Sequence, residues 1–248
     1  MSWIGLLLLG FAVTDLVFSV RPMRHVPEAV GATCVVALGL LADLTDGRDL
    51  TALLVIALLT IAWGQVVTRG FASDHSWWPL ALFGGTVTGA VVLSPYAGNV
   101  DGAVAHWLTQ TPVAVLAGLD GDQALLLAGV MLAQLSTGNV LVRLVLAATG
   151  TVDPGHGSGR EVPTYRLKGG RLLGPMERVF IVGLGLAGEL TAASVVVAAK
   201  GLLRWPELQA ARDEHPRGPG IHQVTEYFLV GSFVSWMLAL AGLVLLGG

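Results

Sequence analysis

The chain is a succession of long apolar runs separated by short polar stretches. Several runs approach about twenty residues, the length that an α-helix needs to cross roughly 30 Å of hydrocarbon. Charged and turn-forming residues mark the ends of the runs, as in RPMRHVP (21–27) and TDGRD (45–49). This pattern predicts spanning helices at residues 3–20, 27–44, 50–68, 77–95, 122–146, 177–202 and 223–246.

Composition supports a membrane protein. The 248 residues are 54% hydrophobic and only 12% charged, whereas a soluble domain has about 25% charged residues. The predicted fold is an all-α polytopic membrane helix bundle of about seven transmembrane helices, with six or eight as alternatives. Region 1–120 would hold about four spans plus an interfacial or re-entrant segment. Region 121–248 would hold three spans and a basic cytoplasmic loop. A net charge of −3 without a basic run argues against nucleic-acid partners.

The stretch AVAHWLTQTPVAVLAGL (103–119) is ambiguous, because it is short for a span and contains His106, Gln110 and Pro112. We interpret it as an interfacial or re-entrant element, with a full span as the alternative. If it does not span and the N-terminus lies outside, nine Lys and Arg residues fall on the cytoplasmic side and five outside. The positive-inside rule then favours an N-out, C-in topology.

The segment 177–202 carries an acid at its centre and a cation near each end. In a continuous helix, the eleven-residue spacing places Arg178, Glu189 and Lys200 on one face. We therefore expect Glu189 to be buried against another helix, beside a polar cavity. A carboxyl that only locks two helices together is the alternative for Glu189. The glycines between 183 and 188 leave a broken, re-entrant segment open as a second topology.

Other polar residues recur at helical spacing. Ser136, Asn139 and Arg143 fall on one face of their predicted helix. In the last span, the residues that share a face are Tyr227, Gly231 and Ser235. His222 and Glu226 are four residues apart, which is weak support for a metal site, and no metal is predicted. Asp15 and Gln65 are single polar residues, to which we assign packing roles.

The loop that includes residues 153–178 is basic and contains Lys168-Gly169-Gly170-Arg171. It lacks the strand and helix of a phosphate-binding loop, so it predicts no nucleotide site and no cofactor. Attraction to anionic headgroups and a cationic lid over a site remain alternative interpretations. No catalytic signature is present, which leaves enzymatic activity uncertain and favours a protein without it.

Four motifs of the second half occur in the order of a known family: NVLVR (139–143), KGGRLLGPMER (168–178), AAKGLLRW (198–205) and EYFLVGSFVSW (226–236). Over about residues 130–246, the chain resembles a bacterial inner-membrane family of unknown function associated with SatD-like proteins. The matching residues are Asn139, Arg143, Lys168, Gly169, Gly170, Glu177, Arg178, Lys200, Arg204, Glu226, Tyr227 and Gly231. The resemblance implies a membrane protein and no established activity, and the N-terminal half departs from the family.

The leading hypothesis is a multi-pass protein of the bacterial cytoplasmic (inner) membrane that binds a small anionic ligand or a lipid headgroup, as a transporter or a sensor-like receptor. The alternatives are a non-catalytic assembly partner or anchor and a lipid-modifying membrane enzyme. Expected partners are membrane lipids; an anionic small molecule, a partner protein and a second copy of the chain are further candidates. The candidate binding residues are Asn139, Arg143, Lys168, Arg178, Glu189, Lys200, Arg204, Glu226 and Tyr227.

Overall fold

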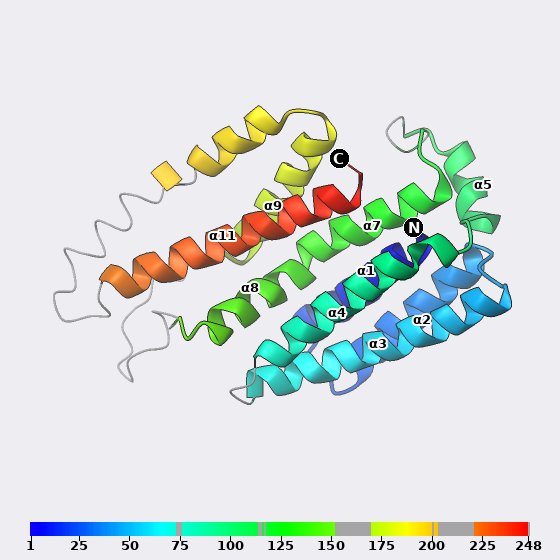
Figure 1. Cartoon of the computed structure of the whole chain (residues 1–248), viewed down its shortest axis with the longest axis horizontal. Coiled ribbons are helices and arrows are strands. Elements are labelled where there is room, and N and C mark those ends of the chain that lie inside the picture. The colour runs from blue at the N-terminus through cyan, green and yellow to red at the C-terminus, as the bar shows by residue number, and fades with distance from the viewer. Residues whose placement is uncertain are drawn as a thin grey trace. The chain divides into compact units, whose positions relative to one another are not determined.

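The computed structural model describes residues 1–72, 76–113, 116, 118–151, 170–199, 201–202 and 221–247. These parts of the chain are helical and contain no β-strand, which confirms the expected all-α fold. The chain divides into two compact units, Met1–Val140 and Leu141–Gly248. Figure 1 shows the helices of both units as long rods. The predicted regions 1–120 and 121–248 stay a prediction.

The N-terminal unit consists of apolar helices with clear local start signals. Pro27 occupies the first turn of α2, where its missing N–H costs nothing. Asp120 and Gln123 form a capping box at the start of α7, with bonds of 2.7 and 3.3 Å. The elements are α1 (Ser2–Val20), α2 (Val26–Leu41), α3 (Gly47–Ala72), α4 (Trp77–Leu93), the 3₁₀ turn η1 (Ser94–Tyr96), α5 (Gly102–Gln110), α7 (Gly121–Leu135) and the start of α8 (Thr137–Ala148).

Helix α1 is the core of this unit. Every residue from Ser2 to Ala12 is buried, and α1 packs against α2, α3, α4 and α7. Its closest approach is to α7, where a Cβ on Gly129 would lie 2.6 Å from the carbonyl oxygen of Gly5. Small residues allow this contact between backbones, as they do in many membrane helix pairs. The apolar character of α1 on all sides is therefore explained by burial within protein.

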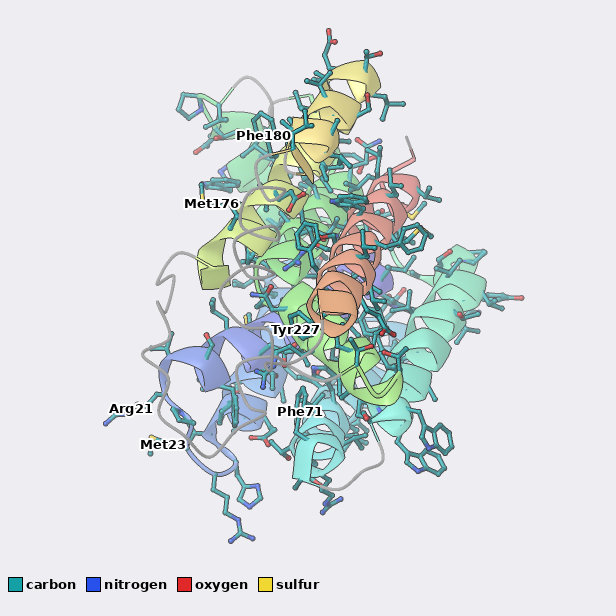
Figure 2. The ribbon with its side chains drawn as sticks, turned by 90° about the vertical axis from the view of Figure 1, so that its left-hand side faces the viewer. Arg21, Met23, Phe71, Met176, Phe180 and Tyr227 are labelled. Atoms are coloured by element: carbon teal, nitrogen blue, oxygen red, sulfur yellow. The ribbon has the colours of Figure 1, made fainter. Side chains whose placement is uncertain are left out.

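The contacts fix the directions of the helices in the unit. Trp3 bonds to Asp49 near the start of α3, and Asp15 bonds to Trp63 further along it, so α1 and α3 run parallel. The start of α7 likewise lies beside Gly5, so α7 is parallel to α1. Figure 2 views the unit toward the opposite end, where Arg21 follows α1. The connecting helices α2 and α4 return in the other direction.

Helix α5 does not cross the unit. Its nine residues span only about 14 Å. The N–H of Asp101, which precedes α5, donates to the carbonyl of Ala42 at 3.0 Å, and Gly121 at the start of α7 packs against Val100. The connection thus begins and ends at the same end of the unit. This agrees with the expectation that 103–119 is not a span.

Among the described residues, fewer helices than the expected seven have the length and composition of a membrane span. Four helices are long and apolar enough to cross a membrane: α1, α3, α4 extended to Tyr96, and residues Glu226–Leu245 of α11. The pair α7 and α8 is a fifth candidate, bent by 49°. Helix α2 has only 16 residues, and the predicted span 177–202 is interrupted. Hydrophobic runs indicate helices, but buried helices and broken helices produce similar runs.

The bend between α7 and α8 lies at Ser136. Its backbone leaves the helical region, and its hydroxyl donates to the carbonyl of Ala12 at 2.8 Å and to that of Leu132 at 3.0 Å. Residues 136–139 are Ser, Thr, Gly and Asn, which are weak helix formers. The side chains of Ser, Thr and Asn compete for backbone hydrogen bonds, and Gly has no side chain to restrict its backbone. The predicted span 122–146 is therefore two helices.

The C-terminal unit is built around α9 (Gly170–Leu186) and α11 (Ile221–Leu245), which pack together. A further helix covers Leu190–Ala199. Between it and α9, Gly188 adopts a positive φ of 79°. The N–H of Glu189 donates to the carbonyl of Leu184 at 2.8 Å, and that of Gly188 to Gly185 at 3.0 Å. This is a Schellman motif, the usual end of a helix at a glycine.

The prediction of one continuous helix over 177–202 is therefore wrong. Glu189 lies at the start of the second helix, and its side chain is exposed. The argument that Arg178, Glu189 and Lys200 share a face required uninterrupted helical rotation, which Gly188 ends. Helical periodicity cannot be carried across a residue with left-handed backbone geometry. The re-entrant topology remains a prediction.

Candidate functional site

A buried carboxylate, Asp15 of α1, joins three helices of the N-terminal unit. Trp63 Nε1 donates to both of its oxygens at 3.1 Å, and Thr137 Oγ1 donates to Oδ2 at 2.7 Å. Asp15 is 8% exposed, and both donors are fully buried. Because intramembrane carboxylates are expensive unless they are bonded, this arrangement explains how α1 tolerates an acid.

Aromatic rings cover the Trp63 side of this network. Phe11 stacks on Trp63 with a centroid distance of 5.0 Å, and Phe83 lies 5.7 Å from the same ring. These rings surround the indole with apolar surface. Hydrogen bonds in such low-polarity surroundings are stronger than in water.

A second buried acid, Glu28, lies on the first turn of α2. It is 8% exposed, and its Oε2 has no hydrogen-bond partner among the described residues. Its side chain passes over Gly64 of α3, where an added Cβ would lie 2.4 Å from Glu28 Cγ. Gly64 therefore provides the space that this side chain occupies.

Asp15 and Glu28 contact consecutive residues of α3. Asp15 contacts Trp63 and Glu28 contacts Gly64, and consecutive helix residues differ by only about 1.5 Å in height. The bend at Ser136 lies beside this level, since Thr137 donates to Asp15. We call this set of buried residues the polar level: Thr14, Asp15, Glu28, Thr60, Trp63, Ser136 and Thr137.

A related pair lies at the other end of α1 and α3. Trp3 Nε1 donates to Asp49 Oδ1 at 2.8 Å, and the N–H of Gly98 donates to the same oxygen at 3.1 Å. Each helix thus supplies one Trp and one Asp to the other. The Asp49 carboxylate also holds the segment that follows η1 in place, so this pair has a structural role.

In the C-terminal unit, α9 and α11 are joined by an adjacent acid and base. Arg178 is only 1% exposed, and its Nη1 donates to Ser235 Oγ at 3.1 Å. Trp236 Nε1 donates to Glu177 Oε1 at 2.9 Å. The structure therefore buries Arg178 between helices. Its position indicates a role in helix packing, where a charge needs bonded partners.

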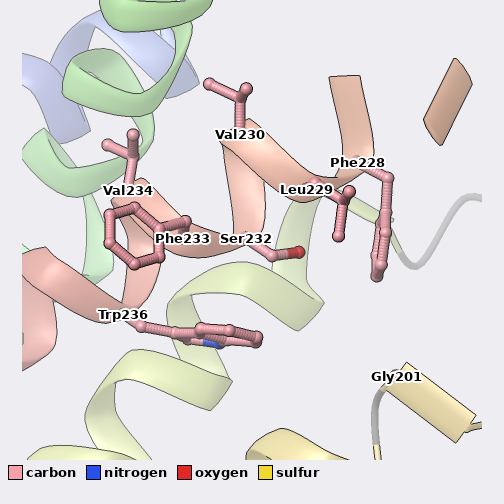
Figure 3. A pocket seen from close by; sticks show the side chains of 8 residues that line it. All are labelled: Gly201, Phe228, Leu229, Val230, Ser232, Phe233, Val234 and Trp236. Carbon is pink, nitrogen blue, oxygen red and sulfur yellow. The ribbon is translucent and has the colours of Figure 1, made fainter. Parts of the chain in front are cut away.

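A cavity of about 430 Å³ lies along α11, close to the same Trp236. Figure 3 shows Phe228, Ser232 and Trp236, one turn apart, lining it with Gly201 opposite. Leu229 and Phe233 add further apolar surface. The volume lies in the range of about 300–1,000 Å³ that ligand sites occupy. This lining fits an apolar chain better than a free anion.

The predicted binding residues lie on several elements or outside the described residues. Arg143, Glu189 and Glu226 are exposed, while Asn139 and Tyr227 are half-buried. Of the face predicted for the last span, Ser235 bonds to Arg178, and Gly231 lies near Leu146 and Val142 of α8. The remaining predicted residues lie outside the described ones: Lys168, Lys200 and Arg204.

Sequence reasoning missed the importance of Asp15 and Glu28. Both are acids in apolar helices, which is the available signal, and the packing role expected for Asp15 does not identify its partners. Their partners on α3 come from more than thirty residues away, so no local pattern pairs them.

Comparison with family models, curated proteins and solved structures finds no match for this chain. The class rests on the helices themselves. In the described parts of the chain, four helices, or five with the bent pair, have the length and composition of membrane spans, as in an integral, multi-pass membrane protein. The resemblance to the SatD-associated family stays a prediction.

Proposed function

We propose that the protein binds an anionic amphiphile, such as a lipid with an anionic headgroup, at the cavity on α11. The observation that carries the proposal is the chemistry of the cavity. Its lining is apolar, and it includes Gly201, which the sequence places between Lys200 and Arg204. An acyl chain suits the lining, and these two cations suit an anionic headgroup.

This proposal changes the roles of the predicted cations. Arg178 is bonded to Ser235 and buried, so it serves to hold α9 against α11. Lys200 and Arg204 become the main headgroup contacts, with Lys168 and Arg143 as further candidates. Asn139, Glu226 and Tyr227 are assigned no contact. Binding of this kind would serve a transporter or a sensor-like receptor. An assembly partner and a lipid-modifying enzyme remain the alternatives.

The charges of the N-terminal unit support the proposed topology. Arg21, Arg24 and Arg69 lie at one end of the helices, and Arg48 lies at the other. The positive-inside rule then places the Arg21 end in the cytoplasm and the N-terminus outside. A bacterial cytoplasmic membrane and a cytoplasmic C-terminus remain part of the proposal.

Displacement of the fluorescent fatty acid cis-parinaric acid from the purified protein in detergent tests the site. Phosphatidylglycerol should displace it more strongly than phosphatidylcholine with the same chains. Leu229→Trp should fill the cavity and weaken binding, whereas Leu54→Trp is the matched control on α3, with a similarly exposed leucine (59% against 62%).

Replacing both Lys200 and Arg204 by Gln should weaken phosphatidylglycerol binding by about tenfold or more, and phosphatidylcholine binding much less. Arg48→Gln controls for the loss of a cation elsewhere. Equal binding of the two lipids, or unchanged binding by Leu229→Trp, would contradict the proposal.

A further inference from the structure

The apolar cavity on α11 contains one hydroxyl group. Of the eight described residues that line it, only Ser232 and Trp236 have a polar atom in the side chain. Trp236 Nε1 already donates to Glu177 Oε1 at 2.9 Å. In Figure 3, the Ser232 oxygen points between the side chains of Phe228 and Trp236. Among the lining side chains, the Ser232 hydroxyl is therefore the hydrogen-bonding group that is left for a bound molecule.

The Ser232 hydroxyl is buried without a partner. The residue is only 6% exposed, and its hydroxyl makes no hydrogen bond within the described parts of the chain. Other serines of the same unit are bonded: Ser194 Oγ donates to the carbonyl of Thr191 at 2.7 Å, and Ser235 Oγ accepts from Arg178 at 3.1 Å. A serine on a helix commonly donates to a carbonyl of the preceding turn, as Ser194 does. Ser232 thus keeps its donor for something other than its own helix.

A water molecule is a poor partner for this hydroxyl. An ordered buried water typically makes about three hydrogen bonds. The side chains that line the cavity offer one such group, at Ser232, and the rest of their surface is apolar. A bound amphiphile can instead bring a hydrogen-bond acceptor to Ser232 and place its chain against Leu229 and Phe233.

The proposed lipid site indicates which acceptor this is. Gly201 lines the cavity and directly follows Lys200, one of the cations proposed for the headgroup. In a lipid with ester-linked chains, the group between headgroup and chain is the ester, whose carbonyl oxygen accepts hydrogen bonds and donates none. An ether-linked lipid has the same headgroup and chains but lacks this oxygen. Ser232, on the lining between the two ends of the ligand, can distinguish them.

We propose that Ser232 donates a hydrogen bond to an ester carbonyl oxygen of the bound lipid and so selects ester-linked over ether-linked lipids. This inference rests on the lipid site proposed above. The apolar lining accepts either kind of chain, and the cations accept the headgroup of either lipid. A site with a buried hydrogen-bonding group discriminates against a ligand that lacks the matching group, because its own group then stays unpaired.

Displacement of cis-parinaric acid by two phosphatidylglycerols tests the selection. One has two ester-linked palmitoyl chains and the other two ether-linked hexadecyl chains. The wild type should bind the ester lipid about three- to tenfold more tightly, as expected for one neutral hydrogen bond. The ratio of the two half-displacement concentrations is compared between variants, because it does not depend on how tightly each variant binds the fluorescent acid.

Ser232→Ala should reduce this ratio to about one, while Ser232→Thr, which keeps a hydroxyl, should retain a preference for the ester lipid. Ser194→Ala is the matched control at an exposed serine of the same unit and should discriminate as the wild type does. Ser232→Ala should still prefer phosphatidylglycerol to phosphatidylcholine, which shows that the variant is folded and recognises the headgroup.

Equal binding of the ester and ether lipids by the wild type would overturn the inference, and so would a preference that persists in Ser232→Ala. In either case, a wild type that still prefers phosphatidylglycerol to phosphatidylcholine would leave the lipid site itself standing. Equal binding of these two headgroups would instead contradict the proposed function, and this inference with it.

Discussion

Trp63 Nε1 lies 3.1 Å from both carboxylate oxygens of Asp15, so one indole N–H connects α3 to α1 across 48 residues of sequence. This bond gives the buried indole N–H an acceptor and gives both oxygens of the buried carboxylate a donor. Thr137 adds a third helix. The polar level is thus a structural centre of the N-terminal unit, and its integrity can be tested by mutation.

Trp63→Phe keeps a ring against Phe11 but removes the indole N–H. Asp15 then retains only the bond from Thr137. We expect a loss of about 1–3 kcal/mol in the free energy of unfolding, the usual cost of an unsatisfied buried polar group. Denaturation of the purified protein measures it. Trp78→Phe, at a ring that is 55% exposed, is the control and should have little effect.

Arg178→Gln should destabilise the packing of α9 against α11. The change removes a buried charge that bonds to Ser235, next to Glu177. Leaving a buried polar group without its bonding partner costs about 1–3 kcal/mol. The midpoint of thermal unfolding reports this loss, and Arg48→Gln at an exposed position provides the comparison. Equal stability of the two variants would show that Arg178 does not stabilise the fold.

Gly64→Ala should be destabilising through Glu28. The new Cβ would lie 2.4 Å from Glu28 Cγ, so one side chain must move, at a cost of about 1–3 kcal/mol. Combining it with Glu28→Ala should restore most of the loss, which a double-mutant cycle measures. Gly85→Ala on α4 is the control, because no described atom lies within 4 Å of the added Cβ. An additive cycle would rule out the contact.

Glu189→Leu should change stability by no more than about 0.5 kcal/mol, since the side chain is exposed. The important residue of this turn is Gly188, whose φ is +79°. A β-branched residue is sterically disfavoured in this left-handed backbone geometry, so Gly188→Val should lower the free energy of unfolding by about 1–2 kcal/mol. Unfolding of both variants side by side decides between this account and a buried Glu189.

Cysteine labelling tests the topology of the N-terminal unit. Cys34 is the single cysteine, so Cys34→Ser gives a cysteine-free background. Thr45→Cys lies in the turn near Arg48, and Met23→Cys lies in the turn that contains Arg21 and Arg24. A membrane-impermeant thiol reagent added to intact cells should label position 45 and leave position 23 unlabelled until the cells are opened. Labelling at position 23 alone would reverse the proposed orientation.

The membrane class and the approximate positions of most helices were available from the sequence. Apolar length and flanking polar residues are local properties, so the predicted spans 3–20, 50–68 and 77–95 lie within or close to α1, α3 and α4. The predicted span 177–202 does not match one helix, because the helix ends at Gly188, which is also a local property. A glycine followed by a new apolar run can end a helix, and hydrophobic length alone cannot reveal it.

Only the tertiary structure decided which polar residues meet. Asp15 and Glu28 are the single charged residues of their apolar helices, Arg178 follows Glu177 in α9, and the sequence contains no information about the distance between helices. The structure places Trp63 against Asp15 and Ser235 against Arg178. The physical reason is that the backbone hydrogen bonds of a membrane helix are all made within the helix, and its apolar faces resemble one another. Their pairing therefore depends on a few glycine contacts and polar bonds between segments far apart in the chain.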